Sequence, residues 1–442
     1  MNCVRRHFAR ALWAILLWCG TLAGEIRTLT ILHTNDLHAR LSPLDNGHGG
    51  FAYLATAVKR ERRGCTDCIF LNAGDLVQGT PVSTIYRGEP IYQLANLLRF
   101  DAATLGNHEF DYGWAQARRF VEIARFPIVS ANVVNASGRT LTPRAYVILE
   151  VNGLRVAVIG AMTDSLETLT TPKSRGEWRA APVLETARKL AAELRPQTDL
   201  IVLLGHIDGH EEQAFLHNAP EIPVLVTGHI HTGLTGALTF EGRVGVRVKS
   251  YGEELGRLEL KVDTVKKAPV SWSWKRIAID SRALPPDPEM AREVKKWEDA
   301  VAVKVDRPLA VSKHAFNKEQ LKALIERALR EATHSDFAWM NEGSIRDTLP
   351  QGQLLERHIW NIMPFDNEVV VGTFRGKDLP PKVTEGRKID PEREYTLAVS
   401  DYTAANQGTD ENLGTTGLRF PRDAGPLRNM LIAWFRNQRV IE

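Results

Sequence analysis

The sequence predicts an α/β protein with two domains, and three observations support this expectation. Short apolar runs rich in β-branched residues alternate with amphipathic helical stretches through the first part of the chain. This pattern is typical of buried strands and covering helices in layered α/β domains. A proline-rich, charged segment then interrupts the pattern, and a second, shorter set of strand-like and helical stretches follows it. The length of 442 residues is enough for about two or three domains of ordinary size.

The first residues have the composition of an export signal. "MNCVRRHFAR" is basic, "ALWAILLWCGTLAG" is apolar, and small residues follow near Ala23 and Gly24. These are the three regions of a signal peptide, and the apolar run is shorter than the roughly 20 residues of a membrane-spanning helix. We therefore expect residues 1–24 to be a cleaved signal peptide and the mature protein to be periplasmic or secreted, with no stable membrane span. An N-terminal anchor is the alternative, and the export route stays open.

A first domain is expected over residues 25–280, because strand-like and helical stretches alternate there. "TLTILHT" precedes "FAYLATAVKRERRG", "CIFLNAG" precedes "PIYQLANLLRF", and "AATLG" precedes "WAQARRFVEIARF". Three further apolar runs, "LRVAVIGAM", "DLIVLLGH" and "PVLVTGH", have the length of buried strands. The chain therefore predicts a layered α/β domain in this part.

A linker and a second domain are expected after this region. "SRALPPDPEMAREVKKWEDAVAVKVDRP" opens with prolines and continues as a charged helical stretch, which predicts a linker helix over residues 281–312. Residues 313–442 contain the helical stretch "NKEQLKALIERALREAT" and the strand-like stretch "NEVVVGTF". They predict a second, smaller α/β domain.

Charge and cysteine content limit the function classes. The net charge is +3, and no basic face with interleaved aromatic residues is evident, so a nucleic-acid partner is not expected. Cys3 and Cys19 fall in the leader, which leaves Cys65 and Cys68. In an oxidising compartment this pair could form a small-loop disulfide. We interpret the two cysteines as structural or incidental.

Five apolar runs of the first domain end in side chains that bind metals. These side chains are, in chain order, Asp36, His38, Asp75, Asn107, His206, His229 and His231. Ligands gather at the carboxyl ends of the strands in α/β sheets, and Asp36 and His38 would point the same way on an extended chain because they are two residues apart. One Gly-His after a strand is usually a turn, but turn chemistry does not explain five such endings in order. The pattern therefore predicts a metal centre.

The donor types indicate two divalent metal ions. The seven side chains, with Asp75 shared, would fill two sites of four ligands each, and Asp75 is the natural bridge because it is an anionic residue on a tight Gly-Asp turn. Histidine, aspartate and asparagine without thiolate suit Mn, Zn, Fe or Co. Two such ions about 3.5–4 Å apart can clamp the attacking and leaving oxygens of a phosphoryl transfer.

These motifs resemble a known superfamily. The ordered run Asp-x-His, Gly-Asp, Gly-Asn-His-Glu, Gly-His and Gly-His-x-His resembles the calcineurin-like metallophosphoesterases. "HTNDLH", "GDLVQGTPVS" and "GNHEFDYG" are similar to the exported 5′-nucleotidase family, which includes UDP-sugar hydrolases and 2′,3′-cyclic-nucleotide phosphodiesterases. The resemblance is strongest from Thr28 to Thr232. It implies a four-layer αββα metallophosphoesterase domain, followed by a smaller α/β substrate domain that is a shortened 5′-nucleotidase C-terminal domain.

The resemblance also implies a role for each site residue. It assigns the first metal to Asp36, His38, Asp75 and His231, and the second to Asp75, Asn107, His206 and His229. It makes His108 the catalytic side chain, which donates a hydrogen bond to the phosphoryl group or the leaving oxygen. It makes Asp111 the residue that orients the His108 ring and favours its charged form, although a cap or turn residue is the alternative for Asp111. A metal-bound hydroxide would be the nucleophile.

Two stretches of the second domain resemble the family's substrate domain. They are "MNEGSIRDTLPQGQL" and "IMPFDNEVVVGTFRGKDL". The resemblance implies that Arg346 contacts phosphate and that Phe365 stacks on a nucleobase, with Asn367 and Tyr402 as further substrate contacts. A solvated surface arginine and a core phenylalanine are the alternatives.

The second domain also departs from the family. "PPKVTEGRKIDPE" stands where the family has a longer stretch that supplies a further phosphate-binding arginine. "NQGTDEN" stands where the family has Gly-Gly-Asp-Gly-Tyr, and Asp410 is out of step with the family's aspartate. The metal core is therefore better determined than the nucleotide specificity.

The expected function is that of a secreted dimetal phosphoester hydrolase that releases phosphate from nucleoside 5′-monophosphates, a small-molecule substrate. A 2′,3′-cyclic-nucleotide phosphodiesterase, a UDP-sugar hydrolase, another small-phosphoester hydrolase and a sulfur-substrate hydrolase are alternatives on the same core. A protein that binds nucleotide without turnover is expected to have lost metal ligands or His108, and all of these are present. The native metal, the oligomeric state and any domain motion stay open.

Overall fold

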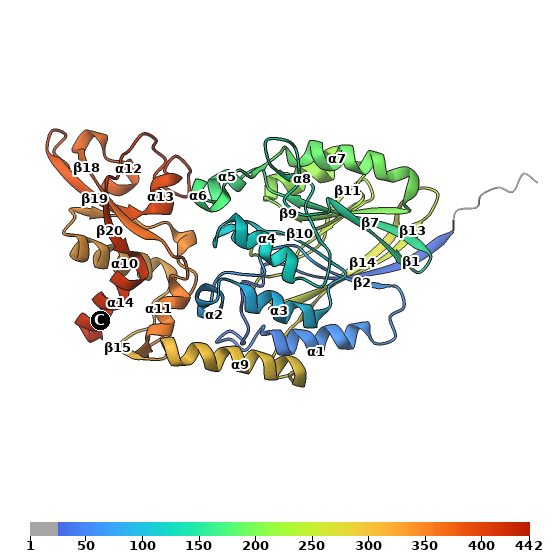
Figure 1. Cartoon of the computed structure of the whole chain (residues 1–442), viewed down its shortest axis with the longest axis horizontal. Helices are drawn as coiled ribbons and strands as arrows, with labels where there is room; N and C mark the ends of the chain where they lie inside the picture. The colour runs from blue at the N-terminus through green and yellow to red at the C-terminus, as the bar shows by residue number, and fades with distance from the viewer. Residues whose placement is uncertain (1–24) are drawn as a thin grey trace, which may run out of the picture.

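The computed structural model describes residues 25–442, and the signal peptide expected over residues 1–24 lies outside this range. The described chain forms a larger and a smaller lobe, joined by a long helix (Figure 1). Within residues 25–442, no helix combines the length and the hydropathy that a membrane crossing requires.

The larger lobe contains two six-stranded sheets. The first has the strand order β14-β13-β1-β2-β3-β4, and the second has the order β11-β12-β10-β9-β7-β6. The strands of the first sheet are β1 (Ile26–Thr34), β2 (Cys68–Asn72), β3 (Ala102–Thr104), β4 (Ile128–Val129), β13 (Glu254–Asp263) and β14 (Ala268–Ala278). Those of the second are β6 (Tyr146–Val151), β7 (Leu154–Met162), β9 (Leu200–His206), β10 (Val224–Gly228), β11 (Leu238–Phe240) and β12 (Arg243–Val246).

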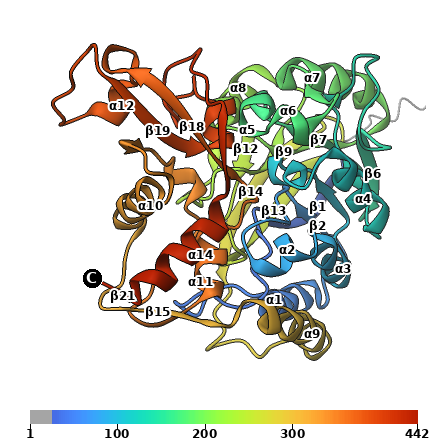
Figure 2. The same cartoon turned by 60° about the vertical axis from the view of Figure 1, so that its left-hand side comes forward.

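The two sheets pack face to face, and helices cover their outer faces (Figures 1 and 2). Leu29 and Ile31 of β1 share a buried core with Val202 and Leu204 of β9. The helices of the larger lobe are α1 (Phe51–Arg62), α2 (Pro81–Ile85), α3 (Glu89–Leu98), α4 (Trp114–Ile123), α5 (Leu166–Leu169), α6 (Pro172–Arg175), α7 (Val183–Leu194) and α8 (Gly209–Asn218). The α1, α3 and α4 side chains pack with the first sheet, and those of α7 and α8 with the second. The predicted four-layer αββα architecture is confirmed.

The strands that precede the candidate ligands run in parallel. In the first sheet β1 pairs in parallel with β2, and β2 with β3. In the second sheet β9 lies between β7 and β10, again in parallel. Because both faces of these strands are covered, their sequences are continuous apolar runs rather than alternating ones. Their carboxyl ends therefore bring the following loops together at one edge of each sheet.

The linker expected over residues 281–312 contains one long helix, α9 (Pro288–Val305). The Asp287 side chain caps this helix by accepting a hydrogen bond from Met290 N. Buried α9 residues, including Val294 and Val301, pack with the core of the larger lobe. The end of the predicted linker, Pro308–Ser312, is already a strand, β15, of the smaller lobe.

The smaller lobe is an α/β unit with its own core. Its strands are β15 (Pro308–Ser312), β16 (Phe337–Ala338), β17 (Gly352–Leu355), β18 (Glu368–Arg375), β19 (Glu394–Ser400), β20 (Arg422–Pro426) and β21 (Val440–Ile441). Its helices are α10 (Lys318–Thr333), α11 (Glu356–Ile362), α12 (Pro381–Thr384), α13 (Asp401–Ala405) and α14 (Leu427–Gln438). Figure 2 shows α10, α11 and α14 beside the strands, and Leu321, Leu329, Leu431 and Phe435 belong to one buried cluster.

The remaining elements are short. They are β5 (Val133–Val134), β8 (Arg179–Ala180) and the 3₁₀ turns η1 (Asn107–Phe110), η2 (Arg195–Gln197), η3 (Glu342–Ser344) and η4 (Gly376–Asp378). β5 and β8 pair with each other in the larger lobe. Of these elements, η1 and η3 contribute to the site described below.

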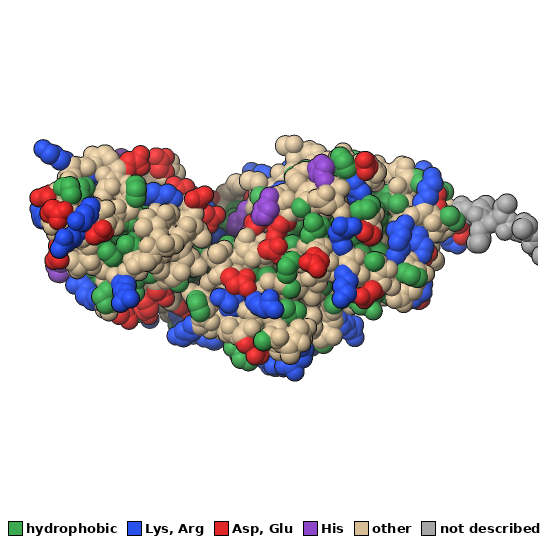
Figure 3. Space-filling model, turned by 90° about the horizontal axis from the view of Figure 1, so that it is seen from above, with side chains coloured by type: hydrophobic (Ala, Val, Ile, Leu, Met, Phe, Trp, Pro, Cys, Tyr) green, Lys and Arg blue, Asp and Glu red, His purple; other side chains and the backbone are tan. Residues whose placement is uncertain are grey.

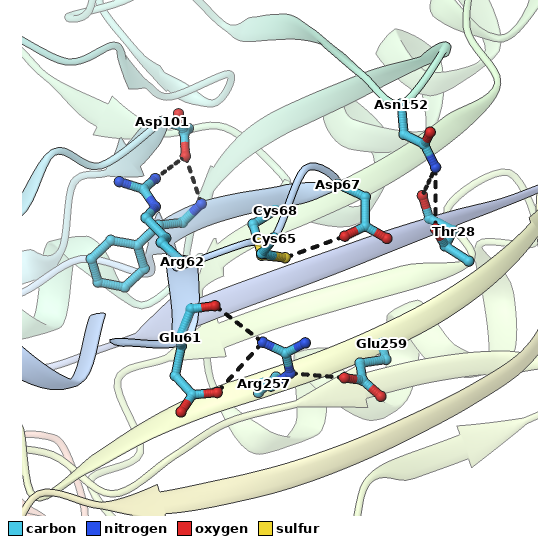
Figure 4. Close-up of a disulfide and its surroundings, with 11 residues drawn as sticks. Thr28, Glu61, Arg62, Cys65, Asp67, Cys68, Asp101, Asn152, Arg257 and Glu259 are labelled. Atoms are coloured by element: carbon cyan, nitrogen blue, oxygen red, sulfur yellow. Dashed lines mark hydrogen bonds and ion pairs between the residues drawn. A yellow bond between two sulfur atoms is a disulfide. The ribbon is translucent and has the colours of Figure 1, made fainter. Parts of the chain in front are cut away.

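Cys65, in the loop after α1, forms a disulfide with Cys68, the first residue of β2, and their Cα atoms are 5.6 Å apart (Figure 4). Around it, Arg62 pairs with Asp101. The sequence had left this pairing open. The disulfide lies at the amino-terminal end of β2, whereas the candidate ligand Asp75 follows the carboxyl-terminal end, so we interpret the disulfide as structural.

Candidate metal centre and active site

Five strands place the candidate ligands. Asp36 and His38 follow β1, Asp75 follows β2, Asn107 begins η1 after β3, His206 ends β9, and His229 and His231 follow β10. All seven side chains belong to the larger lobe. They come from segments up to about 200 residues apart in the sequence, so only the parallel strand arrangement brings them together.

The first group of ligands is compact. One donor atom each of Asp36, His38, Asp75 and His231 lies within 4.8 Å of the others. His38 Nε2 is 2.9 Å from His231 Nε2 and 3.7 Å from Asp75 Oδ2. His231 is partly exposed, whereas the other three residues are buried. Imidazole nitrogens and carboxylate oxygens that converge in this way suit a divalent cation.

The second group shares Asp75 with the first. His206 Nε2 lies 3.2 Å from Asp75 Oδ2 and 3.1 Å from Asn107 Oδ1. The ring of His229 is 4.9 Å from the ring of His206. Asp75 Oδ2 is buried and accepts no hydrogen bond within residues 25–442. Burial alone would raise the pKa of Asp75, but the charges of His206 and His108 lower it well below its usual value. A buried, charged oxygen between imidazoles fits a bridging metal ligand.

The backbone of the ligand loops is in an uncommon conformation. The φ angles are 50° at Asp36, 46° at His38, 52° at Asp75 and 81° at His229. Non-glycine residues rarely adopt this left-handed region, and they do so mainly at functional sites. The sequence predicted that Asp36 and His38 point the same way because they lie on an extended chain. The chain is not extended at these two residues, so this reason is wrong. A folded loop, not an extended strand, brings these two side chains together.

Two glycines are required by close packing at the ligands. A Cβ atom at Gly106 would lie 2.0 Å from Asp75 Oδ1, and one at Gly74 would lie 2.7 Å from His206 Nδ1. Gly74 also has a φ of 86°. The glycines before Asp75 and Asn107 therefore let two ligand loops approach each other more closely than any other residue allows.

His108 and Asp111 form a hydrogen-bonded pair beside the second group. His108 Nδ1 is 2.7 Å from Asp111 Oδ2. Burial alone would lower the pKa of His108, but the charges of Asp111 and Asp75 raise it above its usual value. The Glu109 carboxylate accepts hydrogen bonds from Gly106 N (2.6 Å) and Leu76 N (3.0 Å). Glu109 thus fixes two ligand loops and has a structural role.

The candidate substrate residues lie across a cleft from the ligands. The cleft has a volume of about 800 Å³ and lies between the lobes, and Figure 3 shows the notch with histidines at its edge. Its lining includes His108, Asp111, Arg346, Phe365, Asn367 and Tyr402. Arg346 Nη2 is 3.4 Å from His38 Nε2, and the Phe365 ring is 5.8 Å from the His108 ring at 28°. Tyr402 Oη donates to Thr168 O (3.3 Å).

The sequence did not single out several side chains of the site. Asp208 Oδ1 lies 3.1 Å from His229 Nε2. The only sequence feature that could have indicated Asp208 is its position two residues after His206. Arg428 of α14 donates to Met363 O (2.8 Å), Pro364 O (2.8 Å) and Phe365 O (2.6 Å), so it holds the turn that carries Phe365. Nothing in the sequence around Arg428 indicated this contact.

A buried ion pair supports the His231 loop. Arg247 Nε donates to Glu212 Oε1 (3.0 Å), and both residues are almost fully buried. Arg247 Nη1 donates to Ile230 O (3.0 Å) and also contacts Thr232 O. These carbonyls flank His231, so Arg247 fixes the backbone on both sides of a candidate ligand.

We expect Arg247→Lys to weaken the binding of divalent metal by about 10–100-fold, because residues that orient ligands usually contribute this much. Titration of the metal-free protein with Mn²⁺ in a calorimeter measures the change. Arg243→Lys is the matched control, since Arg243 is also a buried arginine of the β12 segment but packs over Phe240. An equal loss of metal affinity in both variants would contradict a specific role of Arg247.

Comparison with known protein families gives two matches. Residues 29–233 match the family model described as calcineurin-like phosphoesterase. Residues 300–380 match the model described as 5′-nucleotidase, C-terminal domain. The two segments coincide with the ligand-bearing part of the larger lobe and with the part of the smaller lobe that carries Arg346 and Phe365.

Individual proteins are similar over most of the chain. Protein 5NUC of Lutzomyia longipalpis is 30% identical over 416 residues, which cover 79% of this chain and 72% of that protein. Endonuclease YhcR of Bacillus subtilis is 27% identical over 88% of this chain, but the match spans only 38% of YhcR. The crystal structure of a 5′-nucleotidase precursor from Thermus thermophilus superimposes with a TM-score of 0.85 and 23% identity, covering 94% of this chain and 97% of that chain.

Proposed function

Because the chain belongs to the 5′-nucleotidase family of calcineurin-like phosphoesterases and is a dimetal phosphoester hydrolase, we propose nucleoside 5′-monophosphates as its substrates. The observation that carries this proposal is the position of Arg346 and Phe365 of the smaller lobe. Arg346 reaches His38 in the first ligand group, and Phe365 lies over His108. An arginine and an aromatic face thus stand together beside the candidate metal ligands.

Arg346 is suited to bind the phosphoryl group. Its Nε atom is buried and has no hydrogen-bond partner within residues 25–442. Its Nη1 atom donates to Gly343 O (3.2 Å), which holds the guanidinium in place. Arginine presents Nε and Nη in a planar fork that matches two oxygens of a phosphate. A phosphoryl group in the cleft would supply the partner that Nε lacks.

The remaining cleft is suited to a nucleoside. Its volume of about 800 Å³ is that of a small-molecule site. The Arg346 Cζ atom is 5.8 Å from the Phe365 ring, so an aromatic face adjoins the phosphate-binding group. Phe365 would stack on the base, and we propose Tyr402 and Asn367 as further substrate contacts. Base stacking on an aromatic side chain contributes about 1–3 kcal/mol.

Different side chains of the chain would bind the metal ions and assist the leaving group. Asp36, His38, Asp75 and His231 would hold one divalent ion, and Asp75, Asn107, His206 and His229 the other. Bound there, the two ions would activate water and neutralise the phosphoryl charge, and Mn, Zn, Fe or Co suits the donors. His108 would donate a hydrogen bond to the phosphoryl group or the leaving oxygen. Asp111, whose Oδ2 is 2.7 Å from His108 Nδ1, would orient the ring and favour its charged form.

Export is a further part of the proposal. The leader has the three regions of a signal peptide. The disulfide between Cys65 and Cys68 supports an oxidising compartment, since disulfides rarely persist in the cytosol. We therefore propose that the mature enzyme is periplasmic or secreted.

We expect Phe365→Ala to raise the KM for AMP about tenfold, because it removes the base-stacking face. The same variant should hydrolyse β-glycerophosphate, which has no ring to stack, at the wild-type rate. Steady-state phosphate release measures both. Phe374→Ala is the matched control, since Phe374 packs on Phe420 in the same lobe and does not line the cleft. An equal loss on both substrates would argue against a nucleobase at Phe365.

The alternative hydrolases would use the same metal ligands but different substrates, so activity on several substrates distinguishes them. Phosphate release from AMP would be compared with turnover of 2′,3′-cyclic AMP, of UDP-glucose and of a short oligonucleotide. The oligonucleotide is included because the relative YhcR is named an endonuclease. A kcat/KM for AMP that exceeds the other three supports the proposal. A higher kcat/KM for any of the other three would replace 5′-monophosphates as the substrate class.

A further inference from the structure

Arg40 of the larger lobe contacts the loop of the smaller lobe that carries Arg346. Arg40 Nη1 donates to Asp347 Oδ2 (2.9 Å), and Arg40 Nη2 donates to Arg346 O (3.3 Å). Arg40 is only 7% exposed, and the Asp347 side chain is 30% exposed. One guanidinium therefore holds both the backbone of Arg346 and the side chain of the next residue.

Arg40 is itself fixed to the metal centre. Its guanidinium lies 5.1 Å from the centre of the Tyr251 ring, which is within the range of a cation–π contact. The Tyr251 ring is 5.6 Å from the His38 ring and 5.7 Å from the His231 ring. Arg40 also follows His38 by two residues in the same loop. Its position is thus tied to the ligand loops rather than to the lobe surface.

Four hydrogen bonds hold Arg346 and Asp347 in their loop. Arg346 N donates to Ile362 O (2.9 Å), and Arg346 O accepts from Arg40. Asp347 Oδ1 accepts from Thr348 N (2.9 Å), which leaves Asp347 Oδ2 for Arg40. The backbone of Arg346 is therefore held on both sides, and one of the two contacts comes from the metal-bearing lobe.

We propose that the Arg40–Asp347 ion pair positions Arg346 against the metal centre and so sets the affinity for the phosphoryl group. Arg40 and Asp347 are positioning residues: they act through Arg346 and need not touch the substrate. The inference rests on the proposed function of Arg346 as a phosphate contact. It adds a specific connection between the two lobes that the motifs of the chain did not indicate.

The charges around the pair support a role beyond joining the lobes. Three positive charges meet at this contact between the lobes, those of Arg40, Arg346 and Lys318, and Asp347 and Glu342 are among the acidic groups near them. A buried arginine is costly unless a carboxylate pairs with it. Asp347 neutralises Arg40, so the charge of Arg346 is left for an anion. Without Asp347, the unpaired charge of Arg40 would repel the guanidinium of Arg346, whose backbone carbonyl Arg40 now holds.

Asp347→Asn is the most direct test, because it removes the charge but keeps the shape and touches no candidate metal ligand. With the Mn²⁺-loaded protein, we expect inorganic phosphate to bind about tenfold more weakly in a calorimetric titration. We expect the KM for AMP to rise by the same factor at unchanged kcat, since uniform binding is lost. The metal content should equal that of the wild type. Arg40→Lys is a second variant, and it should weaken phosphate binding in the same way.

Glu298→Gln is the matched control. It breaks another ion pair between the lobes, in which Arg357 of α11 meets Glu298 of α9 at 2.7 Å. The Glu298 side chain is 25% exposed, similar to that of Asp347. If Asp347 only joins the lobes, both variants should behave alike. We expect Glu298→Gln to bind phosphate like the wild type.

A double-mutant cycle with Arg346→Ala tests whether the pair acts through Arg346. Arg346→Ala alone should weaken phosphate binding, and adding Asp347→Asn should weaken it no further. Wild-type phosphate affinity in Asp347→Asn, an equal loss in Glu298→Gln, or additive losses in the double variant would each overturn the inference. If the wild type fails to hydrolyse AMP but its phosphate affinity still depends on Asp347, the proposed substrate fails and the positioning role holds.

Discussion

Asp75→Asn is expected to lower phosphate release on the order of a thousandfold. Asp75 is the side chain that the two ligand groups share, with Oδ2 3.7 Å from His38 Nε2 and 3.2 Å from His206 Nε2. The substitution removes the negative charge between several imidazoles, so both ions should bind more weakly. Elemental analysis of the purified variant and its rate of phosphate release from AMP measure the two effects.

Asp101→Asn is the control for this experiment. Asp101 is also an aspartate of the larger lobe, but it pairs with Arg62 near the disulfide (Figure 4), away from the ligand groups. It should retain the metal content and the activity of the wild type. Two bound metal ions per chain together with near-wild-type activity in Asp75→Asn would contradict a shared ligand.

His108→Ala is expected to lower kcat for AMP by about 10²–10⁴-fold, the usual contribution of a positioned proton donor. His108 belongs to neither compact ligand group, and its ring is held by Asp111 at 2.7 Å. The metal content should therefore stay at the wild-type value. This combination of lost turnover and retained metal separates His108 from the seven candidate ligands.

The leaving group provides a second readout for His108. A p-nitrophenolate leaves without needing a proton, whereas the ribose oxygen of AMP does not. The loss in His108→Ala should therefore be smaller for p-nitrophenyl phosphate than for AMP. His217→Ala serves as control, because His217 lies on α8 and its ring packs near Phe240. Equal losses on both substrates would mean that His108 does not assist the leaving oxygen.

The sequence predicted the layered fold and the location of the metal centre for the same physical reason. Buried parallel strands are continuous apolar runs, so their ends are visible in the sequence, and parallel strands bring those ends to one edge. The sequence alone therefore predicts that Asp75, Asn107 and His206 lie at one site. The conformation of the Asp36 loop could not be predicted. A φ of 50° at a non-glycine residue depends on packing that local sequence does not encode.

The contacts between the lobes could not be predicted from the sequence. Arg40 and Asp347 are 307 residues apart, and Arg428 reaches Phe365 from the last helix. A lone arginine in a loop or a helix carries no signal of its partner. For the same reason, the sequence did not predict correctly where the linker ends. Pro308–Ser312 follows a charged helix, and only its pairing with β17 and β21 identifies it as a strand of the smaller lobe.

The central claim is that this chain hydrolyses nucleoside 5′-monophosphates with two divalent metal ions. The measurement that tests it most directly is phosphate release from AMP by the protein from Glu25 onward, with Mn²⁺ or with EDTA, and with bis(p-nitrophenyl) phosphate in parallel. We predict release from AMP that depends on Mn²⁺ and stops with EDTA. Cleavage of the diester alone, or release from AMP that persists in EDTA, would contradict the claim.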